Sequence, residues 1–323
     1  MNLPSFADVV KAKTLSPEDR LAEYQKLVDW SGTESGVKLI GNPYIQSYMT
    51  EHMGKTRFEN KPSLCEVLAD PELSAQLYKH TSTKTRLEVN MPQAFSRMNP
   101  VCFMKPSVAK FIYTKFGATK VLDPTAGWGG RMLGAFACGI DYIGIDTNVS
   151  LQPAYDAMIA ELTPRSKGSA QMLWTDCLSV DFSTLDYDFV FTSPPYCNKE
   201  LYEHMTPFEN RTAFFTRFLI PLLTKCLAHS KPGAWVCFNL AADDYDGLLR
   251  AGFRKADRLE EFYQSTQRRK DGTVKAEIVY CWTTGAPPPA PALAPACPAA
   301  CARCLALEQE IARLKAAMKS LLG

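Results

Sequence analysis

The chain contains 323 residues, of which 46% are hydrophobic and 22% are charged, and this length is enough to bury the core of one large or two smaller domains. Its formal net charge of +2 excludes a global attraction to nucleic acid, so any such contact must come from local basic patches. No apolar run reaches the roughly 18 residues that a membrane-spanning helix needs, and residues 1–11 lack the order of a signal peptide. We therefore expect an intracellular protein of the cytoplasm, or of the nucleus, without membrane contact.

Residues 1–98 are expected to form a helical region with polar faces. Ser16 provides a helix cap and Pro17 the first helical position, and apolar residues follow at helical spacing: Leu21, Tyr24, Leu27 and Val28. The region contains no recognisable chemical motif. We interpret it as a helical cap on the domain that follows, and the alternative is a target-recognition element.

From Lys120 onward, predicted strands and helices alternate. The strands are expected at residues 120–123, 141–145, 170–175, 187–192 and 234–240, and the helices at 130–138, 151–162 and 212–229, the last interrupted by Pro221. This order predicts an α/β fold with a mostly parallel sheet and helices on both faces. Residues 256–264 and 276–283 indicate a closing antiparallel hairpin, so we expect the domain to span residues 99–284.

The segment Ser193-Pro194-Pro195-Tyr196 follows an apolar strand directly. Neither proline can donate a ladder hydrogen bond, so the strand must end there. Ser193 and Tyr196 are therefore presented at the carboxyl end of a strand. In open α/β sheets, ligands bind at this edge.

A second motif, Asp123-Pro124-Thr125-Ala126-Gly127-Trp128-Gly129-Gly130, joins a predicted strand to a predicted helix. Glycines in such a turn let the backbone approach a ligand closely. The next strand ends at Asp146, where a carboxylate can accept hydrogen bonds from both hydroxyls of a ribose. Together these features indicate a nucleotide-binding site.

The two motifs resemble those of the S-adenosylmethionine-dependent amino-methyltransferases, which methylate exocyclic amino groups of adenine or cytosine in nucleic acids. The resemblance covers residues 100–283 and implies a Rossmann-like class I methyltransferase fold with S-adenosylmethionine as cofactor. It implies catalytic roles for Ser193, Pro194, Pro195 and Tyr196, and cofactor contacts by Asp123, Pro124, Ala126, Gly127, Gly129, Asp146, Asp176 and Lys105. We assign no metal to this site.

The resemblance implies a chemical role for each part of the Ser-Pro-Pro-Tyr segment. The Ser193 oxygen and the Pro194 carbonyl would accept hydrogen bonds from the target amine, and Tyr196 would stack on the base. We expect a DNA methyltransferase acting on cytosine N4 or adenine N6, with serine at this position commoner in the cytosine enzymes. The alternatives are an RNA base, a protein glutamine amide, or a non-catalytic adaptor that keeps the fold.

The tip of the predicted hairpin is a local basic patch, and residues 264–275 include Arg268, Arg269, Lys270 and Lys275. Basic and amide side chains suit contacts with nucleic-acid backbone and base edges. We therefore consider this tip the best local candidate for a contact with DNA or RNA.

The end of the chain has two further parts. Residues 285–303 are rich in proline and alanine and predict an extended linker, and residues 304–323 carry apolar residues at heptad spacing. The heptads predict a short coiled coil that would need a second copy of the chain or a partner helix. Cys297, Cys301 and Cys304 have the spacing of iron–sulfur ligands, but their place in a linker favours zinc binding or interchain disulfides.

Overall fold

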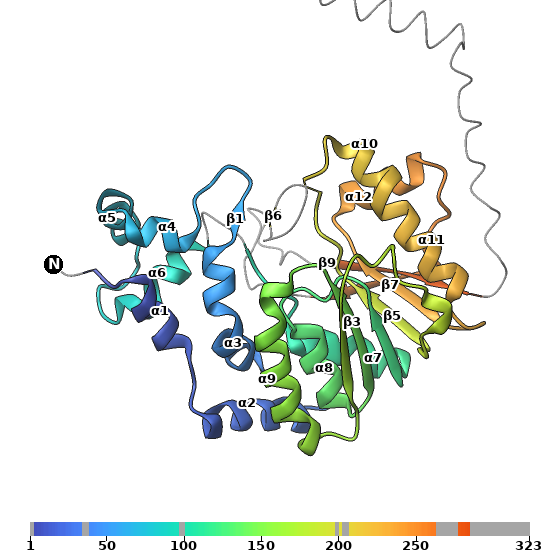
Figure 1. Cartoon of the computed structure of the whole chain (residues 1–323), viewed down its shortest axis with the longest axis horizontal. Coiled ribbons are helices and arrows are strands. Elements are labelled where there is room, and N and C mark those ends of the chain that lie inside the picture. The colour runs from blue at the N-terminus through green and yellow to red at the C-terminus, as the bar shows by residue number, and fades with distance from the viewer. Residues whose placement is uncertain are drawn as a thin grey trace, which may run out of the picture.

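The computed structural model describes residues 3–33, 39–96, 101–197, 200–201, 207–262 and 277–284 (Figure 1). The predicted basic tip at residues 264–275, the linker and the coiled coil lie outside the described residues. Among those that are described, no helix is both long and apolar enough to cross a bilayer.

The N-terminal region is helical, as predicted. Its helices are α1 (Phe6–Lys13), α2 (Pro17–Asp29), α3 (Asn42–Lys55), α4 (Leu64–Ala69), α5 (Pro71–Lys79) and α6 (Leu87–Phe95). Ser16 caps α2 by accepting a hydrogen bond from the Asp19 amide, and Pro17 opens the helix, which confirms the predicted start. Helices α1, α4, α5 and α6 bury a small cluster of their own around Val9 and Leu77.

Helices α2 and α3 pack on the α/β domain. Their Leu27 and Ile45 belong to the same hydrophobic cluster as the helix α7 (Pro106–Phe116). The buried Lys110 ammonium donates hydrogen bonds of 2.8 Å to the carbonyls of Leu27 and Val28 at the end of α2, where helix carbonyls lack intrahelical partners. The two parts therefore share one core.

The domain is built on a seven-stranded sheet. Its strands are β2 (Lys120–Asp123), β3 (Asp141–Asp146), β4 (Ala170–Trp174), β5 (Phe189–Thr192), β7 (Trp235–Asn239), β8 (Arg258–Phe262) and β9 (Glu277–Thr283), in the spatial order β4-β3-β2-β5-β7-β9-β8. The first five strands in this order are parallel, and β9 runs antiparallel to both β7 and β8. This arrangement confirms the Rossmann-like α/β fold with a closing antiparallel hairpin.

Helices cover both faces of the sheet (Figure 1). They are α7, α8 (Gly130–Cys138) and α9 (Gln152–Leu162) on one side, and α10 (Arg211–Phe214), α11 (Ile220–His229) and α12 (Ala242–Arg250) on the other. Neighbouring strand residues pack on opposite faces of the sheet. Val121 belongs to the first hydrophobic cluster, which contains residues of α7, and Leu122 belongs to a second cluster, which contains residues of α11. Pro221 lies in the first turn of α11, after a π-helical turn at residues 215–219.

Helix α12 (Ala242–Arg250) and the strands β1 (Arg57–Phe58) and β6 (Glu200–Leu201) were not predicted from the sequence. Helix α12 carries only a narrow apolar stripe, with Leu248 fully buried, and it has no side-chain cap at its start. A short ladder pairs β1 with β6 in antiparallel register. This ladder brings the N-terminal region to the chain that leaves the Ser-Pro-Pro-Tyr segment.

Candidate active site

The loops after β2 and β5 lie next to each other because these two strands are neighbours at the centre of the sheet. The chain continues from β2 to β3 on one side and from β5 to β7 on the other, so the strand order reverses between β2 and β5. Such a switch point leaves a crevice at the carboxyl ends of the strands. The two motifs predicted from the sequence meet there.

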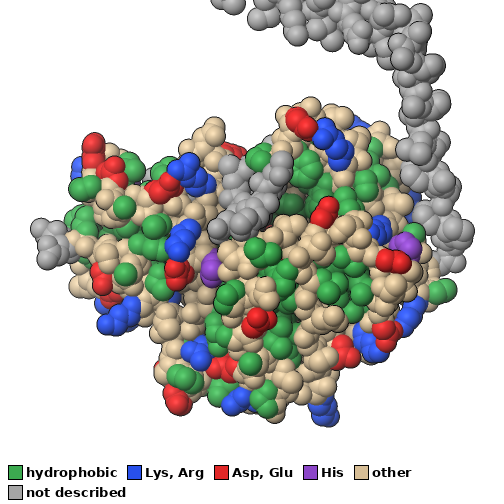
Figure 2. Space-filling model, viewed as in Figure 1, with side chains coloured by type: hydrophobic (Ala, Val, Ile, Leu, Met, Phe, Trp, Pro, Cys, Tyr) green, Lys and Arg blue, Asp and Glu red, His purple; other side chains and the backbone are tan. Residues whose placement is uncertain are grey.

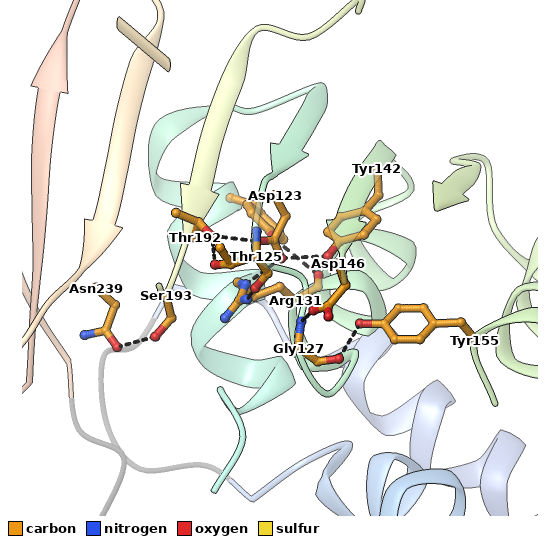
Figure 3. Close-up of polar contacts among 11 residues, drawn as sticks. Asp123, Thr125, Gly127, Arg131, Tyr142, Asp146, Tyr155, Thr192, Ser193 and Asn239 are labelled. Atoms are coloured by element: carbon orange, nitrogen blue, oxygen red, sulfur yellow. Dashed lines mark hydrogen bonds and ion pairs between the residues drawn. The ribbon is translucent and has the colours of Figure 1, made fainter. Parts of the chain in front are cut away.

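Asp123, at the end of β2, is fully buried and makes polar contacts with residues of several elements (Figure 3). One carboxylate oxygen accepts hydrogen bonds of 2.6 Å from Arg131 Nε and from the Tyr142 hydroxyl, and the other accepts one of 2.8 Å from the Thr192 hydroxyl. Burial opposes the charge of Arg131, but Asp123 beside it outweighs that effect and raises the pKa of the guanidinium above its usual value. Asp123 therefore fixes the geometry beneath the cavity.

Gly127, in the glycine-rich turn, contacts Asp146 at the end of β3. The Gly127 φ angle of 60° lies in the left-handed region that favours glycine. Its amide donates a 2.7 Å hydrogen bond to Asp146, which also accepts one of 2.8 Å from the Asn148 amide, and the Tyr155 hydroxyl donates to the Gly127 carbonyl. Burial raises the pKa of Asp146 above its ordinary value, and the two backbone donors only partly oppose that rise.

The segment before α7 closes against this turn. A Cβ atom added at Gly130 would lie 1.9 Å from the Met104 carbonyl oxygen, so only glycine allows the two backbones to approach this closely. Phe103 and Met104 consequently form part of the cavity wall.

Ser193 and Tyr196 lie just beyond β5, and the hydroxyls of both hydrogen-bond to Asn239 at the end of β7. Figure 3 shows the contact between Ser193 and Asn239. The buried Asn239 donates from Nδ2 to the carbonyl of Ile278 at 3.1 Å, which turns its Oδ1 toward the two hydroxyls. Ser193 Oγ donates to that oxygen at 3.3 Å and the Tyr196 hydroxyl donates to it at 3.1 Å. The lone pairs of the Ser193 oxygen are therefore directed away from Asn239 and can accept a hydrogen bond from a ligand.

One cavity of about 930 Å³ connects the glycine-rich turn with the Ser-Pro-Pro-Tyr segment. On the face seen in Figure 2, hydrophobic side chains gather around a hollow. The predicted site residues that line the cavity are Pro124, Ala126, Gly127, Asp146, Asp176, Ser193, Pro194, Pro195 and Tyr196. The structure thus brings together seven residues from the two motifs and two acids, Asp146 and Asp176, from other parts of the sequence.

Three predicted cofactor contacts do not line the cavity: Asp123, Gly129 and Lys105. Asp123 faces Arg131 beneath the floor, Gly129 is the N-cap residue of α8, and Lys105 is the N-cap residue of α7. Burial lowers the pKa of Lys105. The structure places these three residues outside the cavity wall, and it gives Asp123 a buried ion pair with Arg131.

Sequence reasoning missed several residues of the site. Asn239 ends a predicted strand, and a polar residue at that position is a signal that could have been used. Four others line the cavity without such a signal: Phe58, Phe208, Arg217 and Phe218. Arg217 pairs with Glu209 at 2.7 Å, and both side chains are exposed.

Comparison with known proteins gives distant structural likenesses. No protein-family model and no curated protein sequence matches the chain. TrmN from Thermus thermophilus is similar over 59% of this chain and 52% of its own length, with 16% identity and a TM-score of 0.41. An rRNA methylase from Streptococcus thermophilus is similar over 57% and 99%, with 10% identity and a TM-score of 0.37. Precorrin-6y C5,15-methyltransferase from Geobacter metallireducens is similar over 56% and 90%, with 10% identity and a TM-score of 0.38.

This chain therefore spans about half the length of the Thermus protein. Because all three TM-scores lie below 0.5, the fold assignment rests on the strand order and register of the sheet itself.

Proposed function

We propose that the protein transfers a methyl group from S-adenosylmethionine to the exocyclic amino group of a base in DNA, at cytosine N4 or adenine N6. One observation carries the proposal. The Ser-Pro-Pro-Tyr segment opens onto the same cavity as the glycine-rich turn and Asp146, so a nucleotide-like cofactor and a planar amine could lie side by side. Proximity of this kind can supply a large part of the rate enhancement in a displacement reaction.

The donor set of the cavity fits the proposed cofactor. Asp146 presents a carboxylate that suits the two hydroxyls of a ribose. Asp176 comes two residues after β4, the strand next to β3, and lines the same cavity. Phe103 and Met104 add an apolar wall. When bound, S-adenosylmethionine supplies a methyl group activated by a sulfonium.

The residues of the chain would hold the amine for attack. Asn239 directs the hydroxyl hydrogens of Ser193 and Tyr196 toward itself, so the Ser193 oxygen can accept a hydrogen bond from the amine. An amine held in this way keeps its nitrogen lone pair directed away from the serine. The Tyr196 ring supplies a face on which the base can stack.

The acceptor class is tested by incubating the protein with S-adenosylmethionine carrying a labelled methyl group and with DNA, RNA or a glutamine-containing protein. We expect label in DNA that is released by DNase and retained after RNase and protease treatment. Label confined to RNA or to protein would contradict DNA as the acceptor. Absence of any transfer by protein that binds the cofactor would support a non-catalytic adaptor.

The Asp146→Ala variant is expected to bind S-adenosylmethionine at least tenfold more weakly, because hydrogen bonds to a charged acceptor contribute about 1.5–3 kcal/mol each. Since burial raises the pKa of Asp146, cofactor affinity of the wild type should be fully present above that raised pKa and should fall as the pH drops through it. The Asp146→Asn variant cannot titrate at this position and should lack that fall. Calorimetric titrations across pH measure both effects, and unchanged affinity in the alanine variant would contradict the assignment.

The Asn239→Ala variant is expected to lower kcat by roughly tenfold or more, because loss of a buried hydrogen-bond partner costs about 1–3 kcal/mol. Both hydroxyls that it orients would lose their acceptor, whereas the glycine-rich turn would keep its contacts. Steady-state rates and the Kd for S-adenosylmethionine separate the two effects. Weakened cofactor binding with a normal kcat would contradict this positioning role.

A further inference from the structure

Phe58 is an aromatic residue of the N-terminal region that lines the active-site cavity. Its side chain is half-buried, yet it packs in none of the three hydrophobic clusters formed by the described residues. Large aromatic rings usually contribute to stability by packing in a core or an interface. The Lys61 ammonium lies over this ring at 5.7 Å from its centroid, and a ring on a cavity wall outside the core can also stack on a ligand.

The backbone around Phe58 is held on both sides. In the β1–β6 ladder Phe58 pairs with Glu200, and the Phe58 carbonyl accepts a 3.0 Å hydrogen bond from the Lys61 amide. Glu59, between them, has a φ angle of 53°, which is uncommon for a residue other than glycine. The tight turn therefore fixes where the Phe58 ring enters the cavity.

The N-terminal region also anchors β1 from its other end. Arg57 Nε lies 3.1 Å and 3.0 Å from the two carboxylate oxygens of Glu66, which belongs to the capping box at the start of α4. The hydrogen bond from Arg57 is the main reason that the pKa of Glu66 falls to about 2, so the pair stays charged at neutral pH. Phe58 is thus joined both to the helical region and to the chain beyond the Ser-Pro-Pro-Tyr segment.

Other aromatic rings line the same cavity. Phe208 and Phe218 have ring centroids 5.8 Å apart at the edge of the second cluster, and Tyr196 follows the two prolines. A volume of about 930 Å³ lies near the upper end of the range for small-molecule sites, so a planar group can fit beside a cofactor. Aromatic walls suit a nucleobase, which stacks through its π face, better than a protein amide, which has no ring.

We propose that Phe58 stacks on the target base and that the helical N-terminal region is thereby part of the acceptor site. The ligand class is a nucleobase free of its stack, either in a single strand or extruded from a duplex. This inference rests on the function proposed above and adds a residue that determines acceptor binding.

The test compares Phe58→Ala with the wild type in two binding measurements. We expect the Kd for a fluorescently labelled single-stranded DNA 20-mer of mixed sequence, measured by anisotropy, to rise about 5- to 150-fold, as for loss of one stacked base. The Kd for S-adenosylhomocysteine, measured by calorimetry, should stay within about twofold, because the proposal places Phe58 against the base and not against the cofactor. In turnover, KM for DNA should rise by a larger factor than kcat falls.

Matched variants distinguish stacking from folding. Phe58→Tyr keeps the ring and should bind DNA like the wild type, whereas Phe58→Leu keeps an apolar side chain without the ring and should resemble the alanine variant. Leu39→Ala removes an apolar side chain from the same region that is 61% exposed and does not line the cavity, and it should change neither Kd. Thermal unfolding of each variant checks the fold.

The outcomes separate this inference from the proposed function. If the wild type binds and methylates DNA while Phe58→Ala or Phe58→Leu binds it normally, the stacking role is wrong and the proposed function stands. If the wild type neither binds nor methylates nucleic acid, both proposals are wrong.

Discussion

Replacing Tyr196 with alanine is expected to lower kcat/KM for the nucleic-acid acceptor about a hundredfold or more, while the Kd for S-adenosylmethionine stays nearly unchanged. Base–aromatic stacking contributes about 1–3 kcal/mol, and loss of alignment between the reacting atoms adds to this effect. Tyr196 lines the cavity directly after the two prolines, whereas Gly127 and Asp146 hold each other without it. Steady-state kinetics and calorimetry measure the two quantities.

Tyr196→Phe is the matched control because it keeps the ring and removes the hydroxyl, with its 3.1 Å hydrogen bond to Asn239. We expect it to lose about tenfold or less in kcat/KM, as for one hydrogen bond. Normal turnover in the alanine variant, or a loss of cofactor binding with turnover retained at saturating cofactor, would contradict the assignment of Tyr196 to the acceptor side of the cavity.

Replacing Arg131 with methionine is expected to lower the free energy of unfolding by about 3–5 kcal/mol, because it leaves the Asp123 carboxylate buried without its cation. Asp123 is fully buried and Arg131 is 5% exposed, so solvent cannot compensate for the lost partner. The Arg131 guanidinium also donates to the Thr125 carbonyl within the cofactor loop. Chemical denaturation measures the loss, and calorimetry should show weakened cofactor binding.

Two further variants isolate the buried pair. The double variant Asp123→Asn with Arg131→Met removes both charges and should recover part of the lost stability, since the uncompensated charge is then absent. Lys231→Met removes a cation whose partner, Asp186, is 60% exposed, and it should leave Tm nearly unchanged. An Arg131→Met protein as stable as the wild type would show that Asp123 does not depend on this cation.

The alternation of strands and helices could be predicted from the sequence because the central strands are buried on both faces. Residues such as Val190 and Phe191 pack on opposite layers, so the strand reads as a continuous apolar run with clear ends. The glycine-rich turn and Asp146 were also predictable, because their local sequence determines their backbone geometry. Helix α12 was missed because its apolar stripe is narrow.

Some residues could not be assigned to the site from the sequence, because their position there depends on contacts between distant segments. Asn239 lies next to Ser193 only because β5 and β7 are neighbours in the sheet, and Phe58 reaches the cavity only through the pairing of β1 with β6. Asp123 occupies the position expected of a ligand-binding acid, but Arg131, within an otherwise apolar helix, takes up its charge. A buried arginine among apolar residues is the sequence signal from which this ion pair could have been predicted.

The most direct test of the proposed function is mass spectrometry of nucleosides from DNA that has been incubated with the protein and with S-adenosylmethionine carrying a labelled methyl group. The account predicts label in N4-methylcytosine or N6-methyladenine, absent when Tyr196→Ala replaces the wild type. Label at carbon 5 of cytosine or on a ribose oxygen, or no label in any nucleoside, would contradict methyl transfer to an exocyclic amine at this site.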